Sequence, residues 1–298
     1  MPSSAVDSFE AERPHLMAVA YRMLGSRAEA EDVVQDAWLR YDKARRLGEI
    51  EDVRGWLTTV TGRLCLDVLR SARVRRAAYP GQWLPEPVVA RLDDPAERVT
   101  QRQDVSLALL VVMERLTPEQ RVAVVLHDAF GVPFDEIAAV LGTTDIAARQ
   151  HASRGRRAIA AGRARHTADR AEQRRVLEAF LTAAGSGDVH ALAAVLAPDV
   201  VAVSDGGGVV SAGTRPVAGA DRVARLYAGL FRRGAAEVDD LTVEPVLVNG
   251  DVGLVIRGRF RDGRSLRSVV VLTVADGRVT AVYNQLNPAK LGALLDHN

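Results

Sequence analysis

The sequence predicts an all-α part followed by an α+β part, with the change near residue 175. Before that point apolar residues recur at helical spacing, and after it short β-branched runs alternate with Gly and Asp. The 298 residues are enough for two or three domains. With 48% apolar and 26% charged residues, the composition is that of a globular protein and excludes a disordered chain.

Residues 1–78 are predicted to form a first helical domain. One buried stripe has the spacing i, i+3, i+4, i+7, i+11 and consists of Ala30, Val33, Val34, Ala37 and Tyr41. A second helix carries Leu57, Val60, Leu64 and Val68 at similar spacing. A loop at 48–52 is expected between these two helices.

Residues 79–108 are predicted to be an interdomain linker. Prolines 80, 85 and 87 punctuate a non-periodic stretch that includes Trp83-Leu84-Pro85-Glu86-Pro87, so an extended middle is expected. A new helical stretch should begin before Gln103 and run to Leu116.

Residues 109–166 are predicted to form a helix-turn-helix domain. Thr117-Pro118-Glu119-Gln120 has the pattern of a helix start, and that helix should reach about Asp128. A short helix over 134–141, a break at Gly142 and a helix with small inner residues follow. That inner stripe consists of Ala148, Ala152, Gly155 and Ile159.

The charge of the chain is concentrated on and after this last helix. The whole protein has a net charge of only +1, yet nine arginines and three acidic residues lie between Asp145 and Arg175. Helical spacing places Arg149, Gln150, Ser153, Arg154 and Arg157 off the apolar stripe. Because Arg and Gln pair with base edges and other arginines hold phosphates, these residues are candidates for reading DNA.

Residues 174–298 are predicted to form the α+β domain. Helices are expected over 176–184, over 189–196 with Pro198 as its end, and over 221–231. Strands are expected at 200–204 and near 241–248, 252–260, 265–274 and 279–285. Asn249-Gly250, Asp262-Gly263 and Asp276-Gly277 are hairpin signals. Helices followed by a curved antiparallel meander predict a cone-shaped domain.

Several classes of site are excluded at this stage. The single cysteine, Cys65, cannot form an internal disulfide or a cysteine-based zinc or iron–sulfur site. No metal site is predicted, and the function predicted below needs no cofactor. The first residues lack a secretory apolar region, and no apolar run approaches the length of a spanning helix. A cytoplasmic protein without a membrane partner is therefore expected.

The motifs resemble those of extracytoplasmic-function (ECF) bacterial sigma factors. Residues 9–78 and 109–160 resemble sigma regions 2 and 4, in the family's order and spacing. The residues that carry the resemblance are 21–24 (YRML), 30–40 (AEDVVQDAWLR), 54–57 (RGWL), 67–70 (DVLR) and 116–121 (LTPEQR), followed by the helix-turn-helix. The resemblance implies a protein that binds core RNA polymerase and promoter DNA.

The resemblance assigns roles in region 2. The face formed by Asp32, Gln35, Asp36, Trp38 and Leu39 would dock on the clamp helices of the β′ subunit, while region 4 would meet the β flap. Contacts to the −10 promoter element would come from Arg54, Thr59, Arg63, Arg70, Arg73, Arg75 and Arg76. The loop at 48–52 would help to melt DNA and capture a flipped base.

The tail resembles a SnoaL-like domain of the nuclear transport factor 2-like fold, an extension of ECF factors of the SigJ type. The SigJ-type motifs are Trp83, Leu84 and Pro85 in the linker, Asp205, Gly206 and Gly207 in the tail, and Asn287, Pro288, Lys290 and Leu291 near the end. The family usually has a basic residue where Val209 stands and Asp where Ala289 stands. A purely regulatory tail that grips the linker is the favoured prediction.

Two other functions remain open at this stage. A helix-turn-helix regulator with a ligand-sensing tail would have one DNA-reading domain, and the tail's small-molecule ligand would be unknown. A SnoaL-like isomerase or cyclase would use Asp205, with Tyr283, Asn284 and Arg257 as further candidates, for proton transfer. The predicted function is a non-enzymatic sigma factor with a tail that modulates it in cis.

Overall fold

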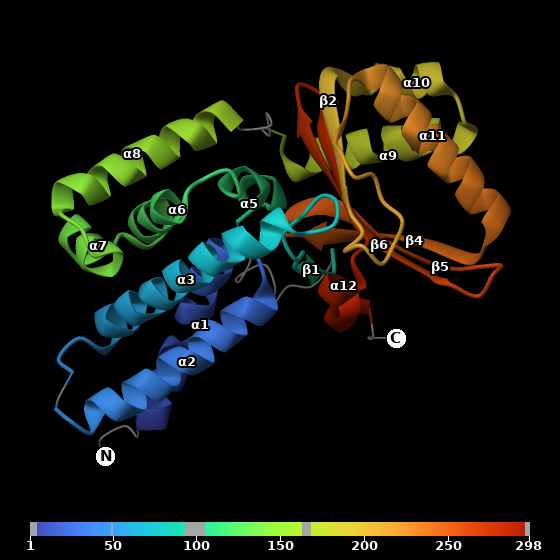
Figure 1. Cartoon of the computed structure of the whole chain (residues 1–298). Helices are drawn as coiled ribbons and strands as arrows, with labels where there is room; N and C mark the ends of the chain where they lie inside the picture. The colour runs from blue at the N-terminus through green and yellow to red at the C-terminus, as the bar shows by residue number, and fades with distance from the viewer. Residues whose placement is uncertain (1–4, 49, 93–104, 163–167, 296–298) are drawn as a thin grey trace. The chain divides into compact units, whose positions relative to one another are not determined.

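The computed structural model describes residues 5–48, 50–92, 105–162 and 168–295 (Figure 1). The chain divides into two compact units. One comprises Met1–Ala78 with Leu109–Gly162, and the other Tyr79–Ala108 with Arg163–Asn298. The linker therefore belongs to the same unit as the α+β tail.

The first unit begins with three long helices, α1 (Ala5–Leu24), α2 (Arg27–Arg45) and α3 (Val53–Ala77). The Ser26 side chain caps α2 by accepting a hydrogen bond from the Glu29 amide at 3.4 Å. All five residues of the predicted α2 stripe are buried. The period of apolar residues thus identified the packed face of α2.

The helix-turn-helix lies in the same unit. It consists of α6 (Pro118–Val124), a π-helical turn (Val125–Ala129), α7 (Phe134–Leu141) and α8 (Asp145–Gly162). Thr117 and Gln120 form the predicted capping box, and Gly142 ends α7 with a left-handed φ of 66°. The helix predicted to reach Asp128 thus changes from α to π geometry after Val124.

The helix expected before Gln103 is α5, which covers only Leu107–Met113. The part of that prediction at 93–104 lies outside the described residues. The loop predicted at 48–52 is described except for position 49.

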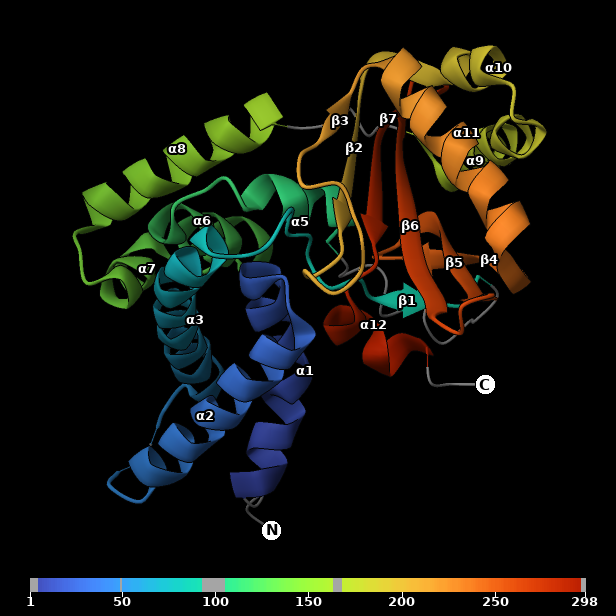
Figure 2. The ribbon, with the colours of Figure 1, turned by 45° about the vertical axis from the view of Figure 1, so that its right-hand side comes forward.

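The second unit packs helices against a curved sheet (Figure 2). Its helices are α9 (Arg170–Ser186), α10 (Val189–Ala194), α11 (Ala220–Glu237) and α12 (Pro288–Leu295). Its strands are β1 (Val89–Ala90), β2 (Leu196–Asp205), β3 (Val217–Ala218), β4 (Val238–Val248), β5 (Asp251–Phe260), β6 (Ser265–Ala275) and β7 (Arg278–Gln285). Their order in the sheet is β1-β4-β5-β6-β7-β2-β3.

The antiparallel meander β4-β5-β6-β7 confirms the predicted hairpins. Asn249 and Asp276 adopt left-handed φ values of 51° and 52° in two of the turns, a conformation that Asn and Asp tolerate better than most residues. Strand β2 runs parallel to β7 and closes the other side of the meander.

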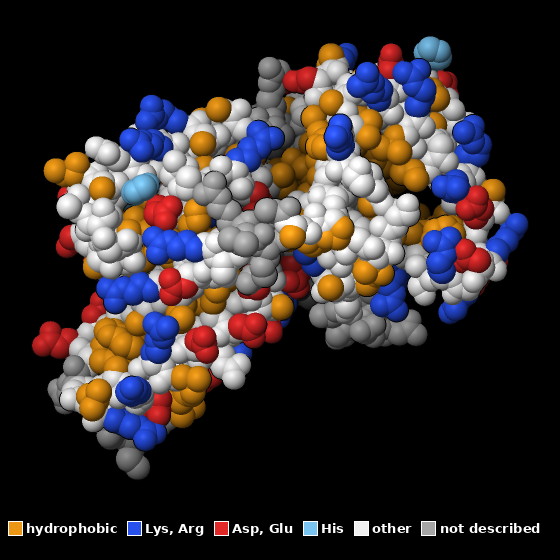
Figure 3. All heavy atoms as spheres, viewed as in Figure 1, with side chains coloured by type: hydrophobic (Ala, Val, Ile, Leu, Met, Phe, Trp, Pro, Cys, Tyr) orange, Lys and Arg blue, Asp and Glu red, His pale blue; other side chains and the backbone are white. Residues whose placement is uncertain are grey.

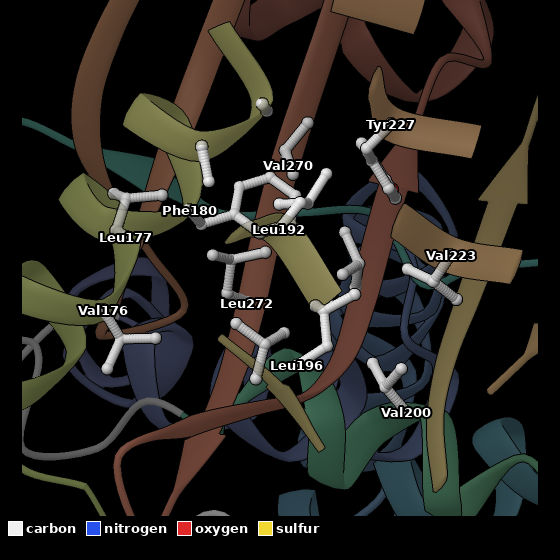
Figure 4. Packing of buried hydrophobic residues seen from close by; sticks show 14 of the residues in the cluster. Val176, Leu177, Phe180, Leu192, Leu196, Val200, Val223, Tyr227, Val270 and Leu272 are labelled. Carbon is white, nitrogen blue, oxygen red and sulfur yellow. The ribbon is translucent and has the colours of Figure 1, made fainter. Parts of the chain in front are cut away.

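Side chains fill the space between the sheet and helices α9, α10 and α11 (Figure 4). Phe180 and Tyr227 meet edge to face with ring centroids 5.3 Å apart, and Leu192, Val200 and Leu272 pack around them. The interior of the cone is therefore an apolar core.

Two sequence predictions in this unit were wrong. The helix expected over 189–196 ends at Ala194, and Leu196 already belongs to β2. Pro198 lies inside β2, where the register with β7 shifts between Leu196 and Val201, so its missing N–H breaks no regular ladder. Strand β1 was not predicted, because two residues of an extended linker carry no periodic signal.

None of the helices within the described residues is both long and apolar enough to cross a membrane.

Candidate functional site

Helix α8 presents the predicted −35 residues on its solvent side. Ala148, Ala152 and Gly155 are buried against the rest of the helix-turn-helix. A Cβ on Gly155 would lie 2.6 Å from a methyl of Val124, so only glycine permits this close approach of α8 to α6. Arg149, Gln150, Ser153, Arg154 and Arg157 are all exposed. Figure 3 shows basic side chains along the outer surface of α8.

Two of the arginines on α8 are held by neighbours. Arg149 pairs with Asp145 at 3.1 Å, and its guanidinium lies 4.6 Å from the centre of the Phe134 ring. Arg156 forms two hydrogen bonds to Asp128 with its Nε, the shorter at 2.8 Å, and this ion pair raises its pKa. The contacts with Phe134 and Asp128 attach α8 to α7 and to the π-helical turn, and Gln150, Ser153 and Arg154 remain exposed.

Helix α3 carries the predicted −10 residues. Arg54 is exposed near its start, where it contacts His15 at 3.1 Å and Glu12 at 3.6 Å. Half-burial of the imidazole and then the Arg54 charge lower the pKa of His15. Thr59 is half-buried, and the side chains of Arg73, Arg75 and Arg76 lie outside the described residues.

Region 4 contacts the same helix within this unit. Arg63 donates a hydrogen bond to the Ala139 carbonyl at 3.0 Å, and Arg70 pairs with Glu119 at 3.0 Å. Directly before Arg63 on α3, Gly62 is close enough to Val140 that a Cβ there would lie 3.3 Å from one of its methyls. Two of the predicted −10 residues are thus engaged by α6 and α7 in this structure.

The predicted polymerase-binding face lies on α2. Asp32, Gln35 and Asp36 are exposed, and Leu39 is 59% exposed. Trp38 is half-buried, with its ring 5.0 Å from that of Phe9. The face therefore combines exposed acidic and polar groups with an aliphatic side chain next to a fixed aromatic ring.

The predicted linker and tail residues meet around the buried Asp205 carboxylate, which is 0% exposed at the end of β2. One oxygen accepts hydrogen bonds from the Tyr79 hydroxyl at 2.6 Å and the Gly207 amide at 3.0 Å. The other accepts from the Leu84 amide at 2.9 Å and pairs with Lys290 at 2.7 Å. A buried carboxylate of the tail thus holds two points of the linker.

Lys290 lies at the centre of this arrangement. Besides Asp205, its ammonium group contacts the Leu84 carbonyl at 2.6 Å and stands 4.1 Å from the centre of the Trp83 ring. Burial and the hydrogen bond to Asp205 raise the pKa of Tyr79, which keeps its hydroxyl protonated as a donor. The ion pair forms although Val209 and Ala289 stand where the family usually has charged residues.

The remaining SigJ-type residues support this contact. The Asn287 side chain donates a hydrogen bond from its Nδ2 to the Tyr79 hydroxyl at 2.9 Å. Gly207 has a φ of 64°, and a Cβ there would lie 2.4 Å from Asn287. Gly206 precedes it in the same turn, and a Cβ there would lie 2.1 Å from the Val210 carbonyl oxygen. Pro288 begins α12, and Leu291 is 1% exposed.

The tail holds the linker at a second place that sequence reasoning missed. The Asn249 amide donates to the Val88 carbonyl at 2.8 Å, and its side chain accepts from the Val88 amide at 3.1 Å. Its Nδ2 also donates to the Val105 carbonyl at 3.1 Å. Asn249 is 3% exposed, and β1 pairs with β4 beside it. Both ends of the linker are therefore bonded to the tail.

Tyr79, Gln82, Asn249 and Gln285 were not among the predicted site residues. Gln285 donates to the carbonyls of Leu84 and Pro85 at 3.4 and 3.2 Å, and Gln82 donates to the Gly213 carbonyl at 2.8 Å. Asn249-Gly250 was interpreted only as a turn. The SigJ-type motifs at Asp205 and Asn287 pointed to this region but not to these four residues.

Three of the residues proposed for proton transfer are each engaged by a different partner. Asp205 is engaged by the linker, Arg257 pairs with Glu244 at 3.1 Å, and Asn284 contacts Ser268 at 2.5 Å. Among the described residues no group of His, Cys, Asp and Glu has the arrangement of a metal site.

Comparisons with known proteins agree with this arrangement. Family models match residues 9–75 as sigma-70 region 2, 106–159 as sigma-70 region 4 and 177–282 as a SnoaL-like domain. The chain is 45% identical over 294 residues to the ECF RNA polymerase sigma factor SigJ of Mycobacterium tuberculosis, covering 96% of this chain and 92% of that protein. It is 31% identical over 156 residues to the sigma factor SigE of Mycolicibacterium smegmatis, covering 52% of this chain and 59% of that protein.

The crystal structure of the M. tuberculosis sigma factor SigJ matches with a TM-score of 0.77 and 42% identity, over 96% of this chain and 98% of that one. Two helical sigma regions and a SnoaL-like tail define a transcription initiation factor with an added domain. The chain belongs to the family of extracytoplasmic-function RNA polymerase sigma factors, with the domain composition of SigJ.

Proposed function

We propose that this sigma factor docks on core RNA polymerase through the α2 face, reads the −35 element with α8 and the −10 element with α3, and is regulated by the grip of its tail on the linker. Exposed acidic and polar groups on α2 suit the cationic clamp helices of the β′ subunit, and the β flap would receive region 4. The protein would act in the cytoplasm and carry out no covalent chemistry.

The observation that carries the regulatory part is the double attachment of the linker. Asp205 and Lys290 hold the segment that directly follows region 2, and Asn249 holds Val105, two residues before α5. A linker bound at both ends cannot span the range of distances that an unbound chain of the same length can reach. The tail would thereby limit the separations at which regions 2 and 4 contact the two promoter elements.

The contacts of α3 with region 4 add a second requirement for binding of the −10 element. Arg63 and Arg70 would have to exchange the Ala139 carbonyl and Glu119 for DNA before they hold the −10 element. An ion pair near the surface, such as Arg70–Glu119, contributes only about 0–1 kcal/mol, and a hydrogen bond such as that of Arg63 about 0.5–1.5 kcal/mol, so phosphate groups can replace both.

Run-off transcription with core polymerase tests the proposal. The promoters differ only in the length of the spacer between the −35 and −10 elements. Core polymerase transcribes them with the wild-type chain, Trp83→Ala, Asp205→Asn or a chain without residues 287–298. We expect wild type to use a narrow range of spacers and the variants to use a wider range with a changed maximum. Asp276→Asn, in an exposed hairpin turn, is the matched control for Asp205→Asn.

Unchanged output and an unchanged spacer range in all three variants would count against the grip of the tail. Failure of the full chain to co-purify with core polymerase would instead favour the helix-turn-helix regulator with a ligand-sensing tail. Turnover of a ketosteroid or polyketide, lost in Asp205→Asn, would favour the enzyme.

A further inference from the structure

Ile146, in the first turn of α8, exposes a large aliphatic side chain on the DNA-reading helix. It is 70% exposed, although isoleucine is usually among the most buried residue types. The residue is placed securely at the helix start, because the Thr144 hydroxyl accepts from the Ala147 amide at 3.3 Å and the Ala148 amide donates to the Thr144 carbonyl at 2.9 Å. Local structure thus holds Ile146 in solvent.

Helix geometry puts Ile146 in the middle of the exposed face. At 3.6 residues per turn, Ile146, Gln150, Ser153 and Arg157 fall within about 60° of one another around the axis of α8. The buried residues Ala148, Ala152 and Gly155 lie on the opposite side. Ile146 is therefore the N-terminal member of the row that contains three of the five predicted −35 residues.

Arg149 is turned away from the middle of this row. It lies on the flank, where it pairs with Asp145 and covers the Phe134 ring. At the N-terminal end of α8 the centre of the reading face is thus occupied by Ile146 and Gln150. In helix-turn-helix proteins the N-terminal residues of the second helix are those that reach the base edges.

We infer that Ile146 is a specificity-determining residue that packs against the C5 methyl group of a thymine in the −35 element. That methyl is the apolar group that a base presents in the major groove, and an aliphatic side chain recognises it by excluding water. The inference rests on the proposed role of α8 in reading the −35 element. It adds one thymine to what Gln150 and the arginines read by hydrogen bonds.

The experiment removes the methyl from the DNA and leaves the wild-type protein intact. Holoenzyme made with the full chain first selects binding sequences from a library with a randomised −35 window. Each selected thymine is then replaced singly by deoxyuridine, which lacks only the methyl. We expect one replacement to weaken binding roughly three- to fivefold, the effect of one lost apolar contact.

The same replacement is then measured with Ile146→Ala. The variant should already bind the thymine duplex more weakly and should lose nothing further on deoxyuridine. Ile146→Val, which keeps a branched side chain, should retain most of the thymine preference. Leu230→Ala removes an exposed aliphatic side chain from α11 and should leave the whole pattern unchanged.

The outcomes separate this inference from the role of α8. If Gln150→Ala and Arg154→Ala leave −35 selectivity unchanged, then α8 does not read that element and both proposals fail. If those variants lose selectivity but no deoxyuridine replacement weakens wild-type binding, the inference for Ile146 alone is overturned. It is also overturned if Ile146→Ala remains as sensitive to the methyl as wild type.

Discussion

Loss of the Lys290 charge should release the linker from the tail. Lys290 lies 2.7 Å from Asp205, with side chains 13% and 0% exposed. Lys290→Met keeps most of the apolar stem and leaves a buried carboxylate without its cation. Breaking a buried ion pair by removing one partner costs about 3–5 kcal/mol. Because Tyr79 and two backbone amides still donate to Asp205, we expect a loss of about 3 kcal/mol.

A double-mutant cycle measures this pair directly. Urea unfolding of the second unit is followed in wild type, Lys290→Met, Asp205→Asn and the double variant, with hydrogen exchange of residues 79–92 reporting on the linker. On the Asp205→Asn background, Lys290→Met should cost about 2 kcal/mol less than in wild type. Arg278→Met, at the exposed first residue of β7, should change stability by about 0.5 kcal/mol or less. Equal costs of Lys290→Met in the two backgrounds would refute the reasoning.

Three other predictions concern local structure. Gly155→Ala should lower the stability of the first unit by about 1–3 kcal/mol, because the added Cβ would meet Val124. Gly185→Ala, on α9 with open space around it, is the control and should be neutral or stabilising. Thermal unfolding compares the two variants, and equal effects would contradict the close packing of α8 on α6. Gly207→Ala should destabilise the second unit by at least about 1 kcal/mol in urea unfolding, because Gly207 has a positive φ and lies close to Asn287. An unchanged free energy of unfolding would show that Gly207 does not adopt this conformation. The pKa of His15 is lowered in the folded protein, so on acidification the unfolded state takes up this proton first and stability falls as the pH drops below about 7. His15→Gln should reduce this dependence of the melting temperature on pH. An unchanged dependence in the variant would exclude His15 as its source.

The sequence predicted those parts of the fold that repeat a pattern. The α2 stripe, the capping box at Thr117 and the glycine after α7 each follow from a local rule, and the structure confirms them. The end of α10 was wrong because Pro198 signals a helix end as well as a bulge in a strand. Propensity alone cannot distinguish these two uses of proline.

Site residues were predictable from the sequence where they all lie on one helix. The exposed row on α8 follows from helical spacing. The roles of Asn249 and Gln285 were not predictable, because they depend on pairing between β1 and β4 and between β2 and β7. Such pairing brings together residues as far apart as Asp205 and Gln285, or Val89 and Val248, and no local pattern records it.

Abortive and run-off transcription by core polymerase with the purified full chain tests the central claim most directly. A promoter selected by the holoenzyme should give a transcript of defined start with wild type. Charge reversal of Asp32 together with Gln35→Ala should lower both holoenzyme assembly and this transcript at least tenfold, while Asp276→Asn leaves them intact. If the α2 variant assembles with core polymerase and starts transcription as wild type does, the α2 face is not the polymerase-binding surface and the account fails.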